Sequence, residues 1–241
     1  EISLGLVASE MCIRDRYNFR TNLDFQFSKC ISMGVRLSYS NACTDQPIRG
    51  WDEEMRQAYM SQPNAPVKWS TGDWAGNNDG NAIQDLVEGG HNIVRTDRLD
   101  ISGNLEIKPI KGLVWNTIVG GNLNIDNVTE EYKSIYRYSV QPGIPVGKLF
   151  VPNYLVRKEN KTLYRNIQTY VTYDVPFLKS HELRIMAGAS YEDSQLDSFY
   201  GRREDFLSND AMTSLDLGIG DQYSGGNITA VSYTHLTLPT K

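Results

Sequence analysis

A regular alternation of apolar and polar residues between Tyr17 and Phe27 constrains the fold of this chain more than any other feature. Its odd positions are Tyr17, Phe19, Thr21, Leu23, Phe25 and Phe27. Its even positions are all polar: Asn18, Arg20, Asn22, Asp24 and Gln26. Because successive side chains of a β-strand point to opposite faces of a sheet, the segment predicts a strand with one apolar and one polar face. Its length matches the roughly 9–11 residues with which a tilted β-strand crosses a membrane.

The alternation recurs along the chain and predicts three hairpins, at about 17–40, 95–125 and 163–192. Their turns are short. In the second hairpin, proline presets φ and glycine tolerates turn conformations within the segment Pro109-Ile110-Lys111-Gly112. This pattern predicts an all-β fold, an antiparallel up-and-down transmembrane β-barrel wall whose six or so strands belong to a larger barrel.

The two faces of the predicted wall differ in chemistry. The apolar face is expected to contact lipid through Phe19, Leu23, Phe25, Val35, Leu37, Ile101, Leu105 and Trp115. The polar face is expected to line the lumen through Arg20, Asp24, Arg36, Asp100 and Arg184. Charges on that face would bridge strands, hold a plug or line a transport route. Arg165 falls on the apolar face, where its long side chain would reach the lipid headgroups.

Long segments separate the hairpins, at 41–92 and 126–162, and another begins at Asp193. Compact soluble domains rarely contain structureless connections beyond about 15 residues, whereas outer-membrane barrels combine short periplasmic turns with long external loops. The long segments are therefore expected to be extracellular, and the short breaks at Ser28, Pro109 and Asp174 periplasmic.

The segment 41–92 contains the richest set of candidate ligand contacts. Flat aromatic faces stack on sugar rings, and nearby carboxylates accept hydrogen bonds from hydroxyl groups. The candidate ligand-binding residues are Trp51, Trp69, Trp74 and Asp73. The alternative is that these aromatic residues pack the loop onto itself or onto a partner protein.

Neither catalysis nor metal binding is indicated. His91 and His181 lie far apart, and the sequence has no GxSxG nucleophile elbow. The Asn-rich segment 77–81 does not fit a calcium-binding EF-hand, because Ala75 and Leu86 stand where acidic ligands are needed. The three cysteines form no CxxC pair and no Cys/His cluster. We therefore expect no enzyme activity, no cofactor and no metal site.

Composition excludes two further classes of protein. The formal net charge of −5 gives no electrostatic reason to expect a nucleic-acid partner. No run approaches the roughly 18 apolar residues of a transmembrane helix, a test that barrel strands escape because only their alternate residues meet lipid.

Both ends of the chain depart from the pattern beside them. Residues 1–16 (EISLGLVASEMCIRDR) and 231–241 (VSYTHLTLPTK) resemble peptides that arise when sequencing-adapter DNA is translated in metagenomic assemblies. The first segment lacks the basic region of a signal peptide. We expect both segments to be adapter-derived and the natural polypeptide to cover about 17–230, as an internal fragment of a longer protein.

Three stretches carry a family resemblance: YNFRTNLDFQFSKCISMGVRLSYS (17–40), RLDISGNLEIKPIKGLVWNTIVGGNLN (98–124) and SHELRIMAGASYE (180–192), with GRREDFLSNDAMTSLDLG (201–218) after the last. In order and spacing they resemble SusC/RagA-type TonB-dependent transporters of the Bacteroidetes. The resemblance implies a barrel of about 22 strands with a plug in its lumen, located in the cell outer membrane. It also implies a SusD-like lipoprotein partner, glycan or peptide substrates, and energy from TonB through the N-terminal part of such transporters.

The sequence thus predicts a fragment of an outer-membrane TonB-dependent nutrient importer. One alternative is an outer-membrane barrel of another function, a receptor or an adhesin. The other is a soluble β-sandwich carbohydrate-binding module, which would need shorter turns and sheet faces that are apolar only toward its core. Such a module would be soluble without detergent.

Overall fold

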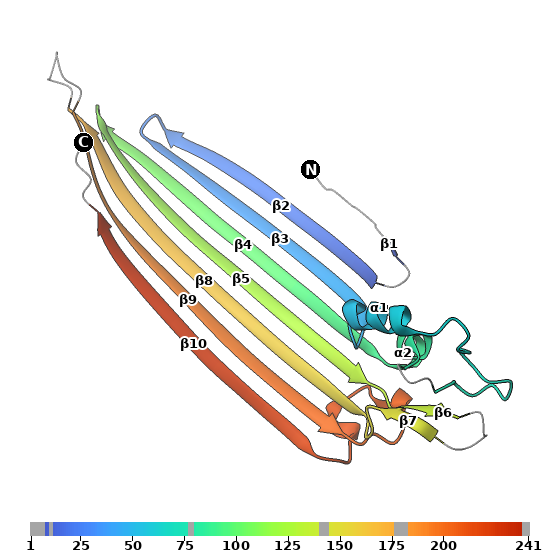
Figure 1. Ribbon diagram of the computed structural model, residues 1–241. Helices are drawn as coiled ribbons and strands as arrows, with labels where there is room; N and C mark the ends of the chain where they lie inside the picture. Colours follow the sequence, from blue (N-terminus) through green and yellow to red (C-terminus); the bar gives the residue numbers. More distant parts are fainter. Residues whose placement is uncertain (1–7, 10–11, 77–79, 140–144, 176–182, 238–241) are drawn as a thin grey trace.

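One antiparallel sheet dominates the computed structural model, which describes residues 8–9, 12–76, 80–139, 145–175 and 183–237 (Figure 1). The strand order is β1-β2-β3-β4-β5-β8-β9-β10, so each long strand pairs with the long strand before it. These strands are β1 (Ala8–Ser9), β2 (Cys12–Ser28), β3 (Ile31–Pro47), β4 (His91–Ile110), β5 (Leu113–Tyr132), β8 (Tyr154–Asp174), β9 (Arg184–Glu204) and β10 (Gln222–Thr237). A second, two-stranded sheet contains β6 (Ile135–Tyr138) and β7 (Pro145–Leu149).

Helical structure is confined to the connections between strands. The helices are α1 (Trp51–Met60) and α2 (Ala82–Glu88), and single 3-10 turns occur at Asn209–Ala211 and Leu215–Leu217. None of the helices in the described ranges is long and apolar enough to cross a membrane.

The prediction of an all-β, up-and-down barrel wall is confirmed, and the six predicted strands are β2, β3, β4, β5, β8 and β9. These strands run for 17 to 21 residues, well beyond the predicted hairpin limits. Their outer halves carry polar residues on both faces, so the alternation that identifies a half-buried strand ends before the strand does. The long segments between hairpins are correspondingly shorter than expected.

A further long strand, β10, lies in a region that the sequence pattern left outside the hairpins. It pairs with β9 from Gln222 opposite Arg203 to Thr237 opposite Gly188. Residues 231–237 therefore lie in a strand, and residues 12–16 extend β2 at the other end of the sheet. The adapter origin of the two ends stays a prediction.

Tight turns join the first two hairpins, as the sequence predicts. Lys111 and Gly112 connect β4 to β5, and Gly112 has a φ of +85°. A side chain at that position would also collide with the backbone carbonyl of Asp174 on the neighbouring β8. Both constraints favour glycine. The predicted turn at 174–181 lies mostly outside the described residues.

The pairing register gives the sheet one apolar and one polar face, because directly opposed residues of antiparallel strands share a face. Leu37 lies opposite both Thr21 and Ile101, and Leu105 lies opposite both Met33 and Thr117. All eight residues predicted to meet lipid fall on this apolar face. All five residues predicted to meet the lumen fall on the opposite, polar face.

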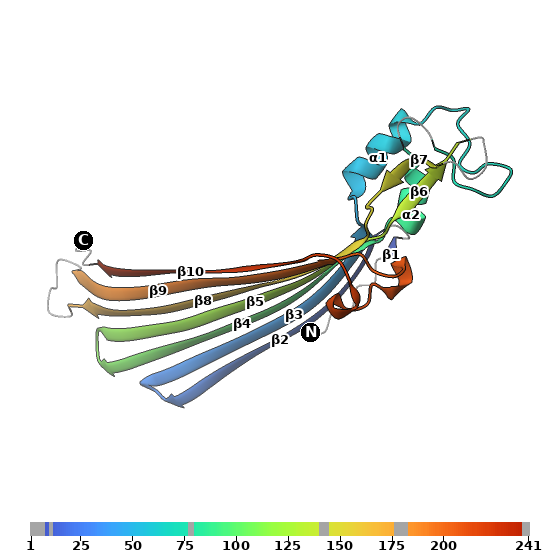
Figure 2. The same cartoon turned by 90° about the horizontal axis from the view of Figure 1, so that it is seen from below.

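Three connections gather at one end of the sheet, beyond β3, β5 and β9. Figure 2 shows α1, α2, β6 and β7 on one side of that end and the connection 205–221 on the other. Phe206, Met212 and Leu215 of that connection pack against Leu155 on the same side of the sheet as the apolar face. We call this end of the molecule the outer end; it consists of α1, α2, β6, β7 and the adjoining end of the sheet.

Candidate functional site

The polar face contains a hollow of about 510 Å³ between β2 and β8. Its charged lining residues are Arg20, Arg36 and Asp100, three of the five residues that the sequence predicts for the lumen. Asn122 donates a hydrogen bond to Asp100, and Tyr164 lies directly opposite Asn122 on β8. The hollow therefore offers cations, an acid, an amide and a phenol within one short stretch of the polar face.

The other two predicted lumen residues lie away from this hollow. Asp24 is exposed on β2, where it faces Gly34 of β3. Arg184 lies at the turn end of β9, where its Nε donates a 2.6 Å hydrogen bond to Asp174. The polar face thus combines a bridged charge pair near the turns with an open hollow further along the strands.

An aromatic group lies on the polar face near the outer end. The rings of Tyr132 and Tyr154 stack with centroids 4.1 Å apart, and Phe150 approaches Tyr132 edge-on at 5.0 Å. The Arg202 guanidinium lies 3.8 Å from the centroid of the Tyr154 ring. Because Tyr154 is held between a ring and a cation, this group stabilises the outer end and presents little free aromatic surface.

An ion-pair network holds the connection 48–90 to β6. Asp85 of α2 accepts a hydrogen bond from Arg49 Nη1 at 2.5 Å and another from Arg137 of β6. The Asp85 side chain is fully buried between these two guanidinium groups. Such a pair is costly to break, since loss of either partner leaves a buried charge uncompensated.

Two neighbouring acids on α1 have opposite surroundings. Arg56 donates hydrogen bonds to Glu53, and this chiefly lowers the pKa of Glu53 to about 2. Glu54 is only 3% exposed, and neither of its carboxylate oxygens has a hydrogen-bond partner among the residues that the structure describes. Its burial, together with the nearby Asp85 carboxylate, raises the pKa of Glu54 to about 7. Glu54 therefore keeps its proton to a higher pH than an ordinary glutamate does.

Three of the four predicted ligand-binding residues lie in one tight turn, where the backbone N–H of Trp69 donates to the Asp73 carbonyl at 2.8 Å and Lys68 pairs with Trp74. The indole N–H of Trp69 donates to the Tyr138 carbonyl at 2.8 Å, and that of Trp74 donates to Glu88 at 2.7 Å. Lys68 covers the Trp74 ring at 4.1 Å, and Asp73 accepts a hydrogen bond from Thr71. The two indole groups thus bind Tyr138 of β6 and Glu88 of α2, and Trp51 is exposed on α1. Ligand binding by these four residues stays a prediction.

The helix α1 has its polar side inward and an apolar side outward. Glu54 and Gln57 are buried, whereas Trp51, Met55 and Tyr59 lie exposed at spacings of four residues. Residues four apart lie on the same face of a helix, so these three side chains form one apolar stripe. Tyr59 is 84% exposed. An exposed apolar stripe on a helix marks a surface for contact with another molecule.

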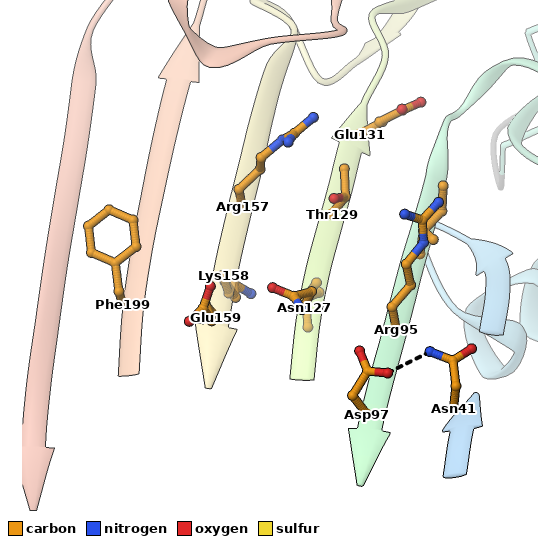
Figure 3. Close-up of a pocket in the computed structure, with 12 residues that line it drawn as sticks. Asn41, Arg95, Asp97, Asn127, Thr129, Glu131, Arg157, Lys158, Glu159 and Phe199 are labelled. Carbon is orange, nitrogen blue, oxygen red and sulfur yellow. Dashed lines mark hydrogen bonds between the residues drawn. The ribbon is translucent and has the colours of Figure 1, made fainter. Parts of the chain in front are cut away.

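A second, larger hollow of about 760 Å³ lies on the other side of the sheet (Figure 3). It continues the apolar face toward the outer end, but there the side chains are polar or charged. They include Arg95, Asp97, Asn127, Thr129, Glu131, Arg157 and Glu159. Asn41 donates to Asp97 at 2.7 Å, as the dashed line in Figure 3 marks. The apolar face therefore ends near Asp97, well short of the ends of the strands.

Arg165 has a partner that the sequence did not suggest. Its guanidinium pairs with Asp193, directly opposite on β9, and Ser232 of β10 donates to the same carboxylate at 2.8 Å. The ion pair lies on the apolar face, in the same cross-strand row as Gly121 and Ile101. Arg165 therefore pairs across strands on that face.

Titratable and metal-binding groups elsewhere do not form a second site. In the described ranges, no group of three or more His, Cys, Asp or Glu residues could hold a metal ion. His91 contacts Asp45 through Nδ1 at 2.8 Å, and Cys30 and Cys43 are free thiols. His181 and most of the Asn-rich segment lie outside the described residues.

No protein-family model matches the chain, and no curated protein sequence matches it. The solved structure of the RagAB peptide transporter superposes with a TM-score of 0.67 at 14% sequence identity, over 93% of this chain and 25% of the solved chain. The RagAB peptide importer in its closed-closed state gives a TM-score of 0.65 at 15% identity. The open-open state gives 0.65 at 13%, and both cover 94% of this chain and 25% of the solved one. The chain therefore shares the fold of this part of the RagAB chains.

The likeness to RagAB chains extends over nearly the whole of this chain but only a quarter of theirs. At this level of identity it establishes the fold. Sequence reasoning identified the polar face but missed the Asn122 and Tyr164 contribution to its hollow, as well as the Glu54 and Asp85 network. These groups are brought together by register and by contacts between distant segments, for which the sequence gives no local signal.

Proposed function

We propose that this chain forms part of the barrel wall of an outer-membrane, TonB-dependent nutrient importer of the SusC/RagA type. The observation that carries the proposal is the apolar face opposite a polar face, on strands with the up-and-down fold of the RagAB transporter. An apolar outward band and a polar interior are the two requirements of a barrel that carries polar solutes across the outer membrane.

In this assignment the apolar face meets lipid and the polar face lines the lumen. The outer end, with α1, α2, β6 and β7, lies on the extracellular side, since the opposite end has the tight turns. The protein binds and passes its substrate without catalysing a reaction. Glycans and peptides are the proposed substrates; peptides are favoured by the names of the RagAB transporter and importer.

A SusD-like lipoprotein is the proposed partner at the outer end, and TonB supplies energy through another part of the transporter. The exposed stripe of Trp51, Met55 and Tyr59 supports a protein contact there. The strands continue beyond the border at Asp97 for six more residues of β4, or about 20 Å at 3.3 Å per residue. At that height the stripe lies too far from the apolar band to contact the bilayer.

The function is tested by uptake in cells that make the full-length protein. Deleting its gene is expected to abolish uptake of labelled oligopeptides or oligosaccharides that exceed the porin limit, and restoring the gene is expected to rescue it. An uncoupler that collapses the proton gradient should stop uptake in wild-type cells, because TonB draws on that gradient. Uptake that persists in the deletion strain, or that ignores the uncoupler, would contradict the proposal.

The alternatives differ in what they predict. A receptor or adhesin barrel would bind its ligand at the cell surface without accumulating it inside the cell. A soluble β-sandwich is not favoured, because in the described ranges the long strands form one sheet and no second sheet packs across its face (Figure 2).

A further inference from the structure

The polar-face hollow contains two arginines that no acid neutralises. Arg20 on β2 and Arg36 on β3 both line it, and both are exposed toward it. Among the residues that the structure describes, neither guanidinium has a hydrogen-bond or ion-pair partner. By contrast, Arg49, Arg137 and Arg165 each bind a carboxylate.

The two arginines are close neighbours on the same face. Arg20 lies directly opposite Ser38, and Arg36 is two residues from Ser38 along β3. Diagonal neighbours of this kind are about 7–8 Å apart between backbones, within reach of long side chains. Two unpaired cations so placed repel each other, and an anion between them would remove that repulsion.

The one acid of the hollow does not fill that role. Asp100 lies opposite Ser38 on β4 and is a diagonal neighbour of Arg36. It accepts a hydrogen bond from the amide of Asn122 on β5, on its side away from the arginines, and among the described residues it forms no ion pair with either arginine. The three charged lining residues therefore leave a net charge of +1. Small residues on the floor, Ser38 and Ser102, leave room for a bound group.

We propose that the Arg20–Arg36 hollow is a carboxylate-binding site on the polar face. The two guanidinium groups supply forked N–H donors that match the two oxygens of a carboxylate, while Tyr164 supplies a hydroxyl from the far wall. The carboxylate belongs either to a substrate, such as an acidic peptide, or to another segment of the same transporter in the lumen. This proposal depends on the proposed function in one respect, the assignment of the polar face to the lumen of a barrel.

Binding by the detergent-solubilised full-length protein tests the site. The probes are fluorescein-labelled hexaglutamate and hexaglutamine, which have the same length and differ in their carboxylates. The variants are Arg20→Gln/Arg36→Gln and, as a matched control, Arg95→Gln, which removes an arginine from the other face of the sheet. Thermal melting of each variant is measured in parallel.

If the carboxylate belongs to a substrate, wild-type protein should bind hexaglutamate more tightly than hexaglutamine. The double variant should then bind hexaglutamate about 10-fold more weakly or worse, the scale of one lost charge-assisted hydrogen bond. The Arg95→Gln control should stay close to wild type. The melting temperatures should agree.

A different result is expected if the carboxylate belongs to another segment of the transporter itself. Hexaglutamate binding would then be weak in every variant, and the double variant would melt several degrees below the Arg95→Gln control. The site is overturned if the double variant matches that control in both binding and melting.

A second variant is available should the first double variant not fold. Arg20→Lys/Arg36→Lys keeps both positive charges but removes the forked N–H donors of the guanidinium groups, and a several-fold loss of binding is expected. The assay needs no energised membrane, so its failure leaves the uptake test of function unaffected.

Discussion

Glu54 makes the outer end sensitive to pH through a single side chain. Its ordinary pKa is 4.5, and in the folded protein burial and then Asp85 raise the pKa to about 7. The charged groups that act on it are Asp85, Arg49, Glu53 and Arg137. The folded state therefore holds a proton that the unfolded state releases, so stability is full below about pH 4.5 and falls as pH rises toward 7.

We expect Glu54→Gln to remove this loss of stability, since the amide is neutral throughout. The measurement is hydrogen exchange of the α1 amides at pH 5 and pH 7.5, corrected for the intrinsic effect of pH on exchange. Asp52→Asn is the control on the same helix. Asp52 is exposed and is not among the charged groups that act on Glu54, so this change should leave the difference between pH 5 and pH 7.5 as in the wild type. An unchanged pH dependence in Glu54→Gln would refute this account.

At the scale of the elements, the strands are longer than a bilayer requires. Seventeen residues span about 55 Å at 3.3 Å per residue, whereas the apolar band of an outer-membrane barrel is about 25 Å tall. The extra length is polar: each strand has one apolar face in its inner half and is polar in its outer half. The border is marked by Tyr39, which donates a hydrogen bond to Asp97 at 2.6 Å.

The two faces of β4 should respond differently to the same substitution. Ile101→Arg places a charge on the apolar face, where the expected cost is about 2–4 kcal/mol near the bilayer midplane. Ser102→Arg places the same side chain on the polar face and should cost far less, because water or polar groups surround it there. Urea unfolding of the full-length protein in liposomes measures both. Equal losses would show that the faces are assigned wrongly.

At the scale of the whole molecule, the described sheet has two open edges. The strand β2 pairs with only two residues of β1, and β10 pairs on one side only within the described ranges. Unpaired strand edges recruit further strands, and the apolar face adds a surface that water does not solvate well. A sheet of this kind is complete only as part of a closed barrel.

We therefore expect this chain, when produced alone, to aggregate in buffer and to remain dispersed only in detergent. Size-exclusion chromatography with and without detergent measures this directly. A soluble monomer in plain buffer would instead support the carbohydrate-binding module. That outcome would count against the membrane assignment of the apolar face.

The hairpins and their faces were determined by the sequence alone. Phe19 and Arg20 lie on opposite faces because side chains alternate along a strand, and the turn at Gly112 depends on the residues next to it. Both features involve neighbouring residues, so they can be recognised directly in the sequence. The six strands of these hairpins and their two faces could therefore be predicted, and the structure confirms that architecture.

Only the tertiary structure decided the rest. The outer halves of the strands and most of β10 carry no alternation that marks them, and their pairing depends on neighbours already in place. The hollow of Arg20, Arg36 and Tyr164 draws on strands up to 144 residues apart. The burial of Glu54 depends on the packing of α1 near α2 and β6. Contacts across such distances are set by register and by packing, which a local pattern does not contain.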